Sequence, residues 1–280
     1  MKKQQLVLLS GGLILLVLLY FFGNTTPPST NSTVVNSGNT TSGTITTADV
    51  LNAARKNLSA QQLSQLVQLE NSVVRGDVKE QKIRIYRQLA SYWQDSLHNQ
   101  EIAAYYFGES AKLENSEKNI NFAARLLLQY VTSEENPAMQ TWLATNAKAL
   151  FEQSLQINPN NDSVQVELGA CYLFGNISST PMDGILKIKQ VTDRDPNNMY
   201  AQLMLGLGDI KSGQYDKAIE RLQLVVKKEP DNLQAVFNLA ETFERKGDKS
   251  NAVAWYRKVE NMINVPEAKQ EIEQRIKTLE

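Results

Sequence analysis

The hydrophobic positions along most of the chain recur with the period of an α-helix. In residues 214–229, QYDKAIERLQLVVKKE, apolar side chains stand three or four positions apart and form a single stripe. Residues 233–243 repeat this spacing, and no segment after Asp49 shows a convincing β-strand alternation. The pattern therefore predicts an all-α domain of short amphipathic helices joined by tight turns.

These helices recur with a fixed period. The small residue Gly206 is followed by Ala240 at the same place in the next unit, and Gly169 stands at this place in the unit before. The interval from Gly169 to Gly206 is three residues longer than the interval from Gly206 to Ala240. The stretch GNISSTP at 175–181 predicts a lengthened turn that accommodates the additional residues.

Two further sets of residues follow the period. Ala218 and Ala252 are separated by the same interval on the predicted second helices, and we expect their small side chains to let neighbouring helices approach closely. Pro159, Pro196 and Pro230 are each followed by Asn-Asn or Asp-Asn. This punctuation predicts the end of one unit and the start of the next.

A helix–turn–helix unit of about 34 residues with small residues at these positions resembles the tetratricopeptide repeat family. Asp209 departs from the family pattern, which has an aromatic residue there. The resemblance is clear over 137–266 and looser over 49–136, a helical, degenerate repeat-like region. It implies a right-handed helical solenoid of antiparallel helix pairs, in which residues 267–280 form a capping helix with one solvated face.

The first residues predict a membrane anchor. Residues 6–22 carry no charge, and Lys2 and Lys3 within residues 1–5 precede them, whereas the next basic residue is Arg55. This asymmetry predicts a single transmembrane helix with a cytoplasmic N-terminus and an extracytoplasmic domain, which is periplasmic in a bacterium. The alternative is a cleaved signal peptide, although the sequence after the apolar run offers no small-x-small cleavage site.

A linker follows the predicted anchor. Residues 23–48 are rich in Ser, Thr and Asn, with no charge and little apolar bulk. Such a segment buries too little apolar surface to offset its ordering entropy, so we predict that it is disordered. Asn24, Asn31 and Asn39 each begin an N-x-T sequon, which we interpret as a consequence of this composition.

Composition and charge argue against several classes of function. The chain has 29 basic and 30 acidic residues, a net charge of −1, and shows no basic stripe of the kind that nucleic-acid binders carry. Cys171 and His98 are the only residues of their types and stand far apart in the sequence. We therefore expect no metal cluster formed by local spacing and no nucleic-acid partner.

A glycine-rich stretch raises the alternative of a phosphate-binding loop. Gly208 and Gly213 have the spacing of a P-loop, but Gln214 and Tyr215 stand where Lys and Ser/Thr are required. The preceding residues are predicted to be helical rather than a strand. We therefore predict no catalytic residue and no cofactor, and an enzyme is the most remote alternative.

The family resemblance implies a binding groove lined mainly by first helices. Its predicted residues are Val166, Ala170, Leu173, Phe174, Tyr200, Leu203, Leu207, Ile210, Gln234, Phe237, Glu241 and Arg245. In chaperone-binding members, Lys, Asn and Arg at such positions grip a terminal carboxylate, whereas this sequence has Leu203 and Leu207. The apolar character favours an amphipathic helix or an apolar segment as the partner. The alternative is that another part of the same chain covers the stripe.

These features together predict a membrane-anchored scaffold or adaptor that mediates protein–protein interaction on the extracytoplasmic side. The arrangement is similar to that of membrane-anchored bacterial repeat proteins of envelope assembly, including components of cytochrome c biogenesis. The alternative is a structural module that associates with itself as a homo-oligomer.

Overall fold

The computed structural model describes residues 45–75, 78–177 and 181–280. The predicted anchor at 6–22 and residues 23–44 of the predicted linker lie outside the described residues, as does the N-terminus before them. The described residues belong to one compact unit. No helix in its described part is both long and apolar enough to cross a membrane.

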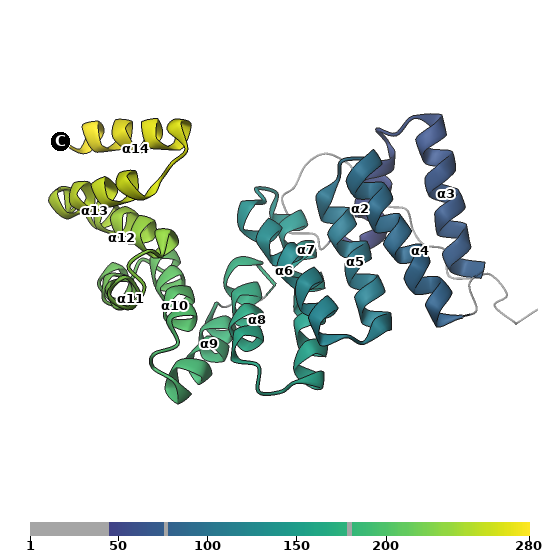
Figure 1. Cartoon of the computed structure of the whole chain (residues 1–280), viewed down its shortest axis with the longest axis horizontal. Coiled ribbons are helices and arrows are strands. Elements are labelled where there is room, and N and C mark those ends of the chain that lie inside the picture. The colour runs from purple at the N-terminus through teal and green to yellow at the C-terminus, as the bar shows by residue number, and fades with distance from the viewer. Residues whose placement is uncertain (1–44, 76–77, 178–180) are drawn as a thin grey trace, which may run out of the picture. The chain divides into compact units, whose positions relative to one another are not determined.

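The described residues are predominantly helical (Figure 1). In chain order the helices are α2 (Thr47–Arg55), α3 (Ala60–Arg75), α4 (Lys79–Ser91), the π-helix η1 (Tyr92–Ser96), α5 (Gln100–Glu114), α6 (Glu117–Ser133), α7 (Pro137–Ile157), α8 (Asp162–Phe174), α9 (Met182–Arg194), α10 (Met199–Lys211), α11 (Tyr215–Lys228), α12 (Leu233–Lys246), α13 (Lys249–Met262) and α14 (Pro266–Leu279).

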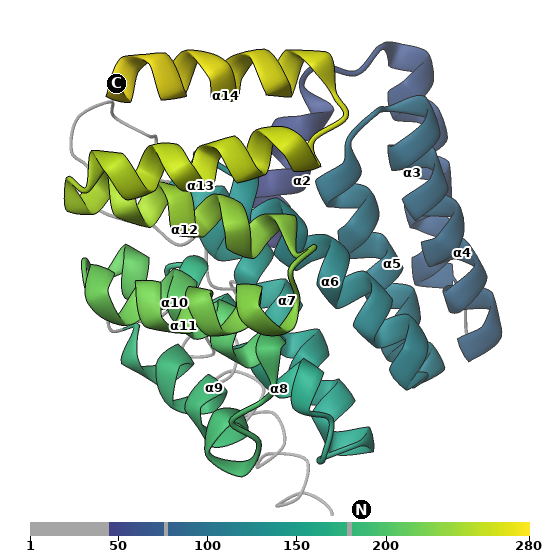
Figure 2. The ribbon, with the colours of Figure 1, turned by 60° about the vertical axis from the view of Figure 1, so that its left-hand side comes forward.

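Consecutive helices form pairs that pack on one another in sequence. The closest neighbours are α4 with α5, α6 with α7, α8 with α9, α10 with α11, and α12 with α13. Each pair contacts the next, and α14 packs on α13 at the C-terminal end (Figure 2). This arrangement is the all-α solenoid that the repeat period predicts, because each pair buries its remaining apolar surface on its neighbours.

Asparagine side chains start the first helix of each repeat. Asn161, Asn198 and Asn232 are the N-caps of α8, α10 and α12, and each side-chain oxygen accepts a hydrogen bond from the backbone N–H three residues later, at 3.0–3.2 Å. A cap of this kind satisfies one of the unpaired N–H groups of a helix start. The Asn that ends each Pro-Asn-Asn or Pro-Asp-Asn stretch therefore fixes where a unit begins.

The predicted small residues stand where paired helices approach most closely. A Cβ atom added to Gly184 in α9 would lie 2.5 Å from the carbonyl oxygen of Gly169 in α8. Gly208, which has no assigned role in the repeat pattern, faces the previous pair, because a Cβ there would lie 3.3 Å from the side chain of Leu173. The turn between α10 and α11 contains Gly213 at a φ of 73°, a conformation that favours glycine.

Asp209 departs from the family pattern for a local electrostatic reason. Its carboxylate accepts a hydrogen bond from Arg221 Nε at 3.0 Å, and Arg221 Nη1 donates to Gln202 Oε1 at 2.8 Å. An ion pair and an amide therefore join α10 to α11 where the family places an aromatic ring. Burial raises the pKa of Asp209, and Arg221 acts against that shift.

Helix α8 is buried on two faces. Val166, Ala170 and Leu173 belong to the core that continues toward the C-terminus, whereas Leu168 and Cys171 belong to the core on the N-terminal side. An inner helix of a solenoid contacts its own partner and both neighbouring pairs, so little of its surface stays free. This position explains why α8 is apolar almost all the way round.

Helix α2 begins at Thr47, within the predicted linker, whose predicted end is residue 48. Thr46 and Asp49 form a capping box: the Thr46 hydroxyl accepts from the Asp49 N–H at 3.2 Å, and the Asp49 carboxylate accepts from the Thr46 N–H at 2.9 Å. These two hydrogen bonds satisfy donors at the helix start. Hydrogen bonds from Thr46 also lower the pKa of Asp49.

A tryptophan on α7 holds the start of α2. Trp142 Nε1 donates a hydrogen bond to Thr47 Oγ1 at 3.0 Å, and the Trp142 ring packs 5.5 Å from the ring of Tyr105. Trp142→Phe keeps an aromatic ring but removes the donor, so we expect α2 to open more readily, by about 1 kcal/mol. Hydrogen exchange should show faster exchange in α2 and unchanged rates in α12. Equal protection of α2 in both proteins would show that the hydrogen bond contributes nothing.

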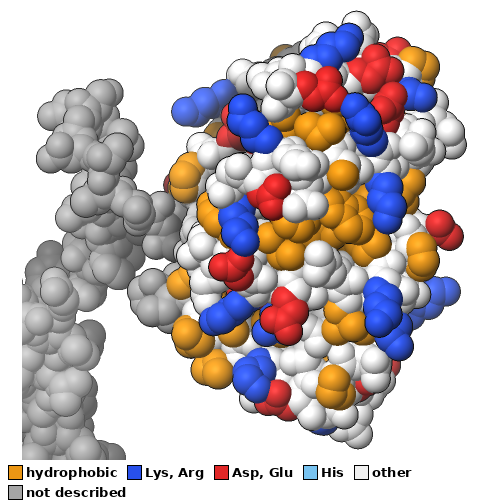
Figure 3. Space-filling view, turned by 90° about the vertical axis from the view of Figure 1, so that its left-hand side faces the viewer, with side chains coloured by type: hydrophobic (Ala, Val, Ile, Leu, Met, Phe, Trp, Pro, Cys, Tyr) orange, Lys and Arg blue, Asp and Glu red, His pale blue; other side chains and the backbone are white. Residues whose placement is uncertain are grey.

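The surface carries charges of both signs. On the face toward the left-hand side of Figure 1, apolar side chains gather in a band across the middle, with basic and acidic side chains interspersed around it (Figure 3). Mixed charges of this kind produce no field of a single sign across this face.

Candidate peptide-binding groove

A groove runs across the first helices of successive pairs. It lies over α6, α8, α10 and α12, reaches Gln140 near the start of α7, and encloses about 710 Å³. This volume falls within the range of about 300–1,000 Å³ that is typical of ligand pockets. The helices that the family resemblance assigns to a binding surface therefore meet at one groove.

The lining residues of α10 and α12 occupy equivalent positions of two repeats. On α10 they are Tyr200, Met204, Leu207, Ile210 and Lys211. On α12 they are Gln234, Asn238, Glu241 and Arg245. Four positions on each helix match after a shift by one repeat unit, so the repeat places one face of each helix toward the groove. The α10 face is mainly apolar, whereas the α12 face is polar.

Seven of the predicted groove residues line this groove. They are Phe174, Tyr200, Leu207, Ile210, Gln234, Glu241 and Arg245. Tyr200 is the most open of the apolar ones, with 37% of its surface exposed. Ile210 is only 8% exposed and belongs to the core, so the other six residues are the candidates for contact with a partner.

The prediction is wrong for the four residues of the set that lie in the core. Val166, Ala170, Leu173 and Leu203 are at most 3% exposed and pack between helix pairs. They occupy the face of α8 or α10 that turns toward a neighbouring pair, so they cannot line an open surface. Phe237 also lies outside the groove lining, because its partly buried ring packs 6.2 Å from the ring of Tyr256.

Residues that the sequence analysis missed complete the groove. On the repeats they are Glu167, Met204, Lys211 and Asn238, and on the preceding pair they are Arg125, Leu128, Gln129, Thr132 and Gln140. A helix face recurs at i, i+4, i+7 and i+11, and this spacing applied from Tyr200 finds Met204 and Lys211. The α6 residues carry no such signal, because the repeat pattern is degenerate there.

Arg125 and Glu167 form an ion pair at one side of the groove. Arg125 Nε donates to Glu167 Oε1 at 2.6 Å, and the Glu167 side chain is only 8% exposed. Glu167 Oε2 is also buried and has no hydrogen-bond partner among the described residues. Burial raises the pKa of Glu167, and the Arg125 guanidinium acts against that shift.

The other charges of the groove lie on α10 and α12. Arg245 Nη2 donates to Glu241 Oε1 at 2.7 Å, one helical turn away. Lys211 Nζ instead donates to the backbone carbonyl of Leu173 at 2.8 Å and lies 5.7 Å from the centre of the Phe174 ring. Burial lowers the pKa of Lys211. In the described part of the chain, Lys211 has no carboxylate within ion-pair distance.

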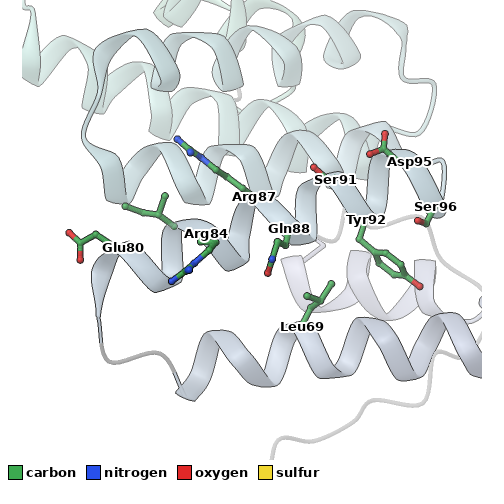
Figure 4. Close-up of a pocket in the computed structure, with 10 residues that line it drawn as sticks. Leu69, Glu80, Arg84, Arg87, Gln88, Ser91, Tyr92, Asp95 and Ser96 are labelled. Carbon is green, nitrogen blue, oxygen red and sulfur yellow. The ribbon is translucent and has the colours of Figure 1, made fainter.

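A second pocket, of about 810 Å³, lies between α3 and α4. Leu69 points into it from α3, while Arg84 and Gln88 point toward it from α4 (Figure 4). Tyr92, at one end, donates to Gln65 Oε1 at 2.9 Å. Among the described residues, no buried polar atom without a hydrogen-bond partner belongs to the lining of this pocket, whereas Glu167 of the groove has one. We therefore take the smaller groove as the candidate site.

The two residue types that appear once in the sequence stand apart from the groove. Cys171 is fully buried in the core, and burial raises the pKa of its thiol. His98 is exposed, in the turn between η1 and α5, at a φ of 52°. Both placements are those that helix packing and a polar turn predict.

The repeat family is confirmed by comparison with family models. The model of the tetratricopeptide repeat matches residues 203–268, which run from α10 to the start of α14. Residues 203–268 therefore match the tetratricopeptide repeat, and the described helix pairs on either side of them continue the all-α solenoid. Among curated proteins, no sequence match was found.

Several solved structures are similar in their arrangement of helices. MamA from Desulfovibrio magneticus RS-1 is 22% identical, and the match covers 67% of this chain and 96% of that one, with a TM-score of 0.44. PilW, a widely conserved type IV pilus biogenesis factor, is 18% identical over 70% and 92%, with a TM-score of 0.48. YrrB, a repeat protein with an unusual peptide-binding site, is 14% identical over 74% and 97%, with a TM-score of 0.42. Likenesses at this level say nothing about what this chain binds.

Proposed function

We propose that this protein is a membrane-anchored scaffold whose groove binds an amphipathic helix or apolar segment of a partner protein on the extracytoplasmic side. The observation that carries the proposal is the apolar row along α10. Tyr200, Met204 and Leu207 lie on one helix face and line the groove; Tyr200 and Leu207 are its open members, whereas Met204 is 7% exposed. A surface of this shape suits a segment that inserts apolar side chains at helical spacing.

The membrane part of the proposal rests on residues 6–22 and on the two lysines before them. An anchor there would hold the repeats close to the membrane surface and leave the groove available to partners. An extracytoplasmic scaffold of this architecture favours a role in envelope assembly, such as the assembly of c-type cytochromes. Protease treatment of spheroplasts tests the topology, because an extracytoplasmic domain is accessible to the protease there and a cytoplasmic one is not.

Leu207→Glu should abolish capture of the partner. The substitution places a carboxylate on the apolar row, where a bound apolar side chain would desolvate it, which costs about 1–3 kcal/mol. We expect cross-linking in cells, read by mass spectrometry, to lose at least about tenfold of the partner signal. Circular dichroism should remain that of the unchanged protein, because Leu207 is only partly buried.

Two leucines provide matched controls for this experiment. Leu186 on α9 is 52% exposed and lies outside the groove lining, so Leu186→Glu should leave partner capture unchanged. Leu203 is 3% exposed, so Leu203→Glu should reduce the helical signal itself. Equal partner signals for Leu207→Glu and Leu186→Glu, with both proteins folded, would contradict the proposal.

A further inference from the structure

One end of the groove carries a positive charge that no acidic side chain of the described residues neutralises. Lys211 is at the C-terminal end of α10, beside the Phe174 ring and within hydrogen-bond distance of the Leu173 carbonyl. An ammonium group has three N–H donors, and one carbonyl occupies only one of them. The remaining donors are available to an acceptor that enters the groove.

The other charged groups of the groove are already matched. Arg125 pairs with Glu167, and Arg245 pairs with Glu241. Three cations and two anions line the groove, so its net charge is positive and the excess lies at Lys211. Charge complementarity therefore favours a carboxylate over a cation at this end.

Glu167, on α8, carries a buried hydrogen-bond acceptor in the same groove. Glu167 Oε1 is occupied by Arg125, whereas Glu167 Oε2 is buried without a partner among the described residues. Because Arg125 already balances the charge, the free oxygen suits a neutral donor such as a hydroxyl or an amide N–H. Glu167 and Phe174 are two helical turns apart on α8, which corresponds to about 10 Å along the helix axis.

We propose that the groove selects an apolar segment of a partner protein that carries a carboxylate for Lys211, which lies beside Phe174, and a hydroxyl or amide donor for Glu167, two turns of α8 away from Phe174. The inference rests on the proposed function and specifies the chemistry of the ligand. Apolar side chains of the segment contact Tyr200 and Leu207.

Synthetic amphipathic helical peptides test the inference. Each peptide has one apolar face with Glu, Gln or Lys at one end of that face, and Ser or Ala two helical turns away. Their affinities for the full-length protein in detergent are measured by fluorescence anisotropy. We expect the Glu peptide to bind about tenfold tighter than the Lys peptide, and Ser to bind about threefold tighter than Ala.

Variants of the protein show which residue causes each of these binding preferences. Lys211→Glu should invert the preference for Glu over Lys, whereas Lys227→Glu, an exposed change on α11 outside the groove, should leave it unchanged. Glu167→Met should remove the preference for Ser over Ala. Circular dichroism of each variant shows that the fold is retained.

The outcomes separate this inference from the proposed function. Equal affinities for the Glu, Gln and Lys peptides would overturn the inference. If these peptides also compete with one another and do not bind Leu207→Glu, the groove is still a binding site and the proposed function stands. A charge preference that Lys211→Glu does not change would also overturn it. Absence of binding by any peptide would overturn it too, and cross-linking in cells would then decide the proposed function.

Discussion

Gly184→Ala should lower the free energy of unfolding by about 2 kcal/mol, because one methyl group has no space between α8 and α9. The added Cβ would lie 2.5 Å from the carbonyl oxygen of Gly169 and 3.0 Å from side-chain atoms of Tyr172 and Leu173. The first contact is with backbone, so only a movement of one whole helix can relieve it. A loss of this size corresponds to a fall in melting temperature of about 5 °C, measured by circular dichroism.

The matched control is Gly206→Ala at the first-helix small position of the next repeat. A Cβ there would lie 3.3 Å from the side chain of Leu222, which can move by a few tenths of an ångström. Alanine also favours a helix over glycine by about 1 kcal/mol, which offsets the small repulsion. We expect little change for Gly206→Ala. Equal melting temperatures for Gly184→Ala and the unchanged protein would show that α8 and α9 do not depend on this close approach.

Arg125→Met should destabilise the protein by about 2 kcal/mol at neutral pH, because it leaves the Glu167 carboxylate buried without its only hydrogen-bond donor among the described residues. Methionine keeps much of the apolar length of the side chain, so the main change is the loss of the guanidinium. Urea unfolding followed by circular dichroism measures the effect. Arg257→Met is the control, because its pair with Glu280 is exposed on both sides and is expected to contribute at most about 0.5 kcal/mol.

The effect of Arg125→Met should depend on pH in a defined direction. Burial raises the pKa of Glu167 in the folded protein, so the folded state holds this proton more tightly than the unfolded state. The contribution of Glu167 to stability is therefore favourable when the group is protonated and is lost as pH rises through the raised pKa. Loss of Arg125 raises that pKa further, so the deficit of the variant should shrink as pH falls toward about 4.5.

Glu167→Gln provides the neutral reference for this pair. In the double variant with Arg125→Met the buried carboxylate is absent, so most of the lost stability should return and its pH dependence should disappear. A deficit of Arg125→Met that stays constant with pH and persists in the double variant would show that packing by the arginine side chain, rather than its charge, is what matters.

The repeat predicted much of the fold, because the properties that define a helix pair are local. The repeat period, the small residues and the Pro-Asn punctuation each correspond to a structural feature: a helix pair, a close contact such as that of Gly169 with Gly184, and an N-cap such as Asn198. The start of helix α2 was not predicted from the sequence. Its capping box at Thr46 lies inside a stretch whose overall composition predicts disorder.

The candidate groove was predicted only in part, because periodicity alone does not distinguish a face that is open from one that is covered. Leu203 and Leu207 are equally apolar and stand one helical turn apart, yet the first is in the core and the second lines the groove. Which of them is covered depends on where the neighbouring pair lies. The position of that pair depends on packing between residues far apart in the sequence.

The sequence by itself determined the type of helix, the length of the unit and the residues at which units begin, since these follow from contacts within one or two helices. Only the tertiary structure decided which side chains remain exposed after the units pack on one another. It also brought Arg125 to Glu167, 42 residues later, and left Lys211 without a carboxylate partner among the described residues. The charges that give the groove its proposed selectivity result from that packing.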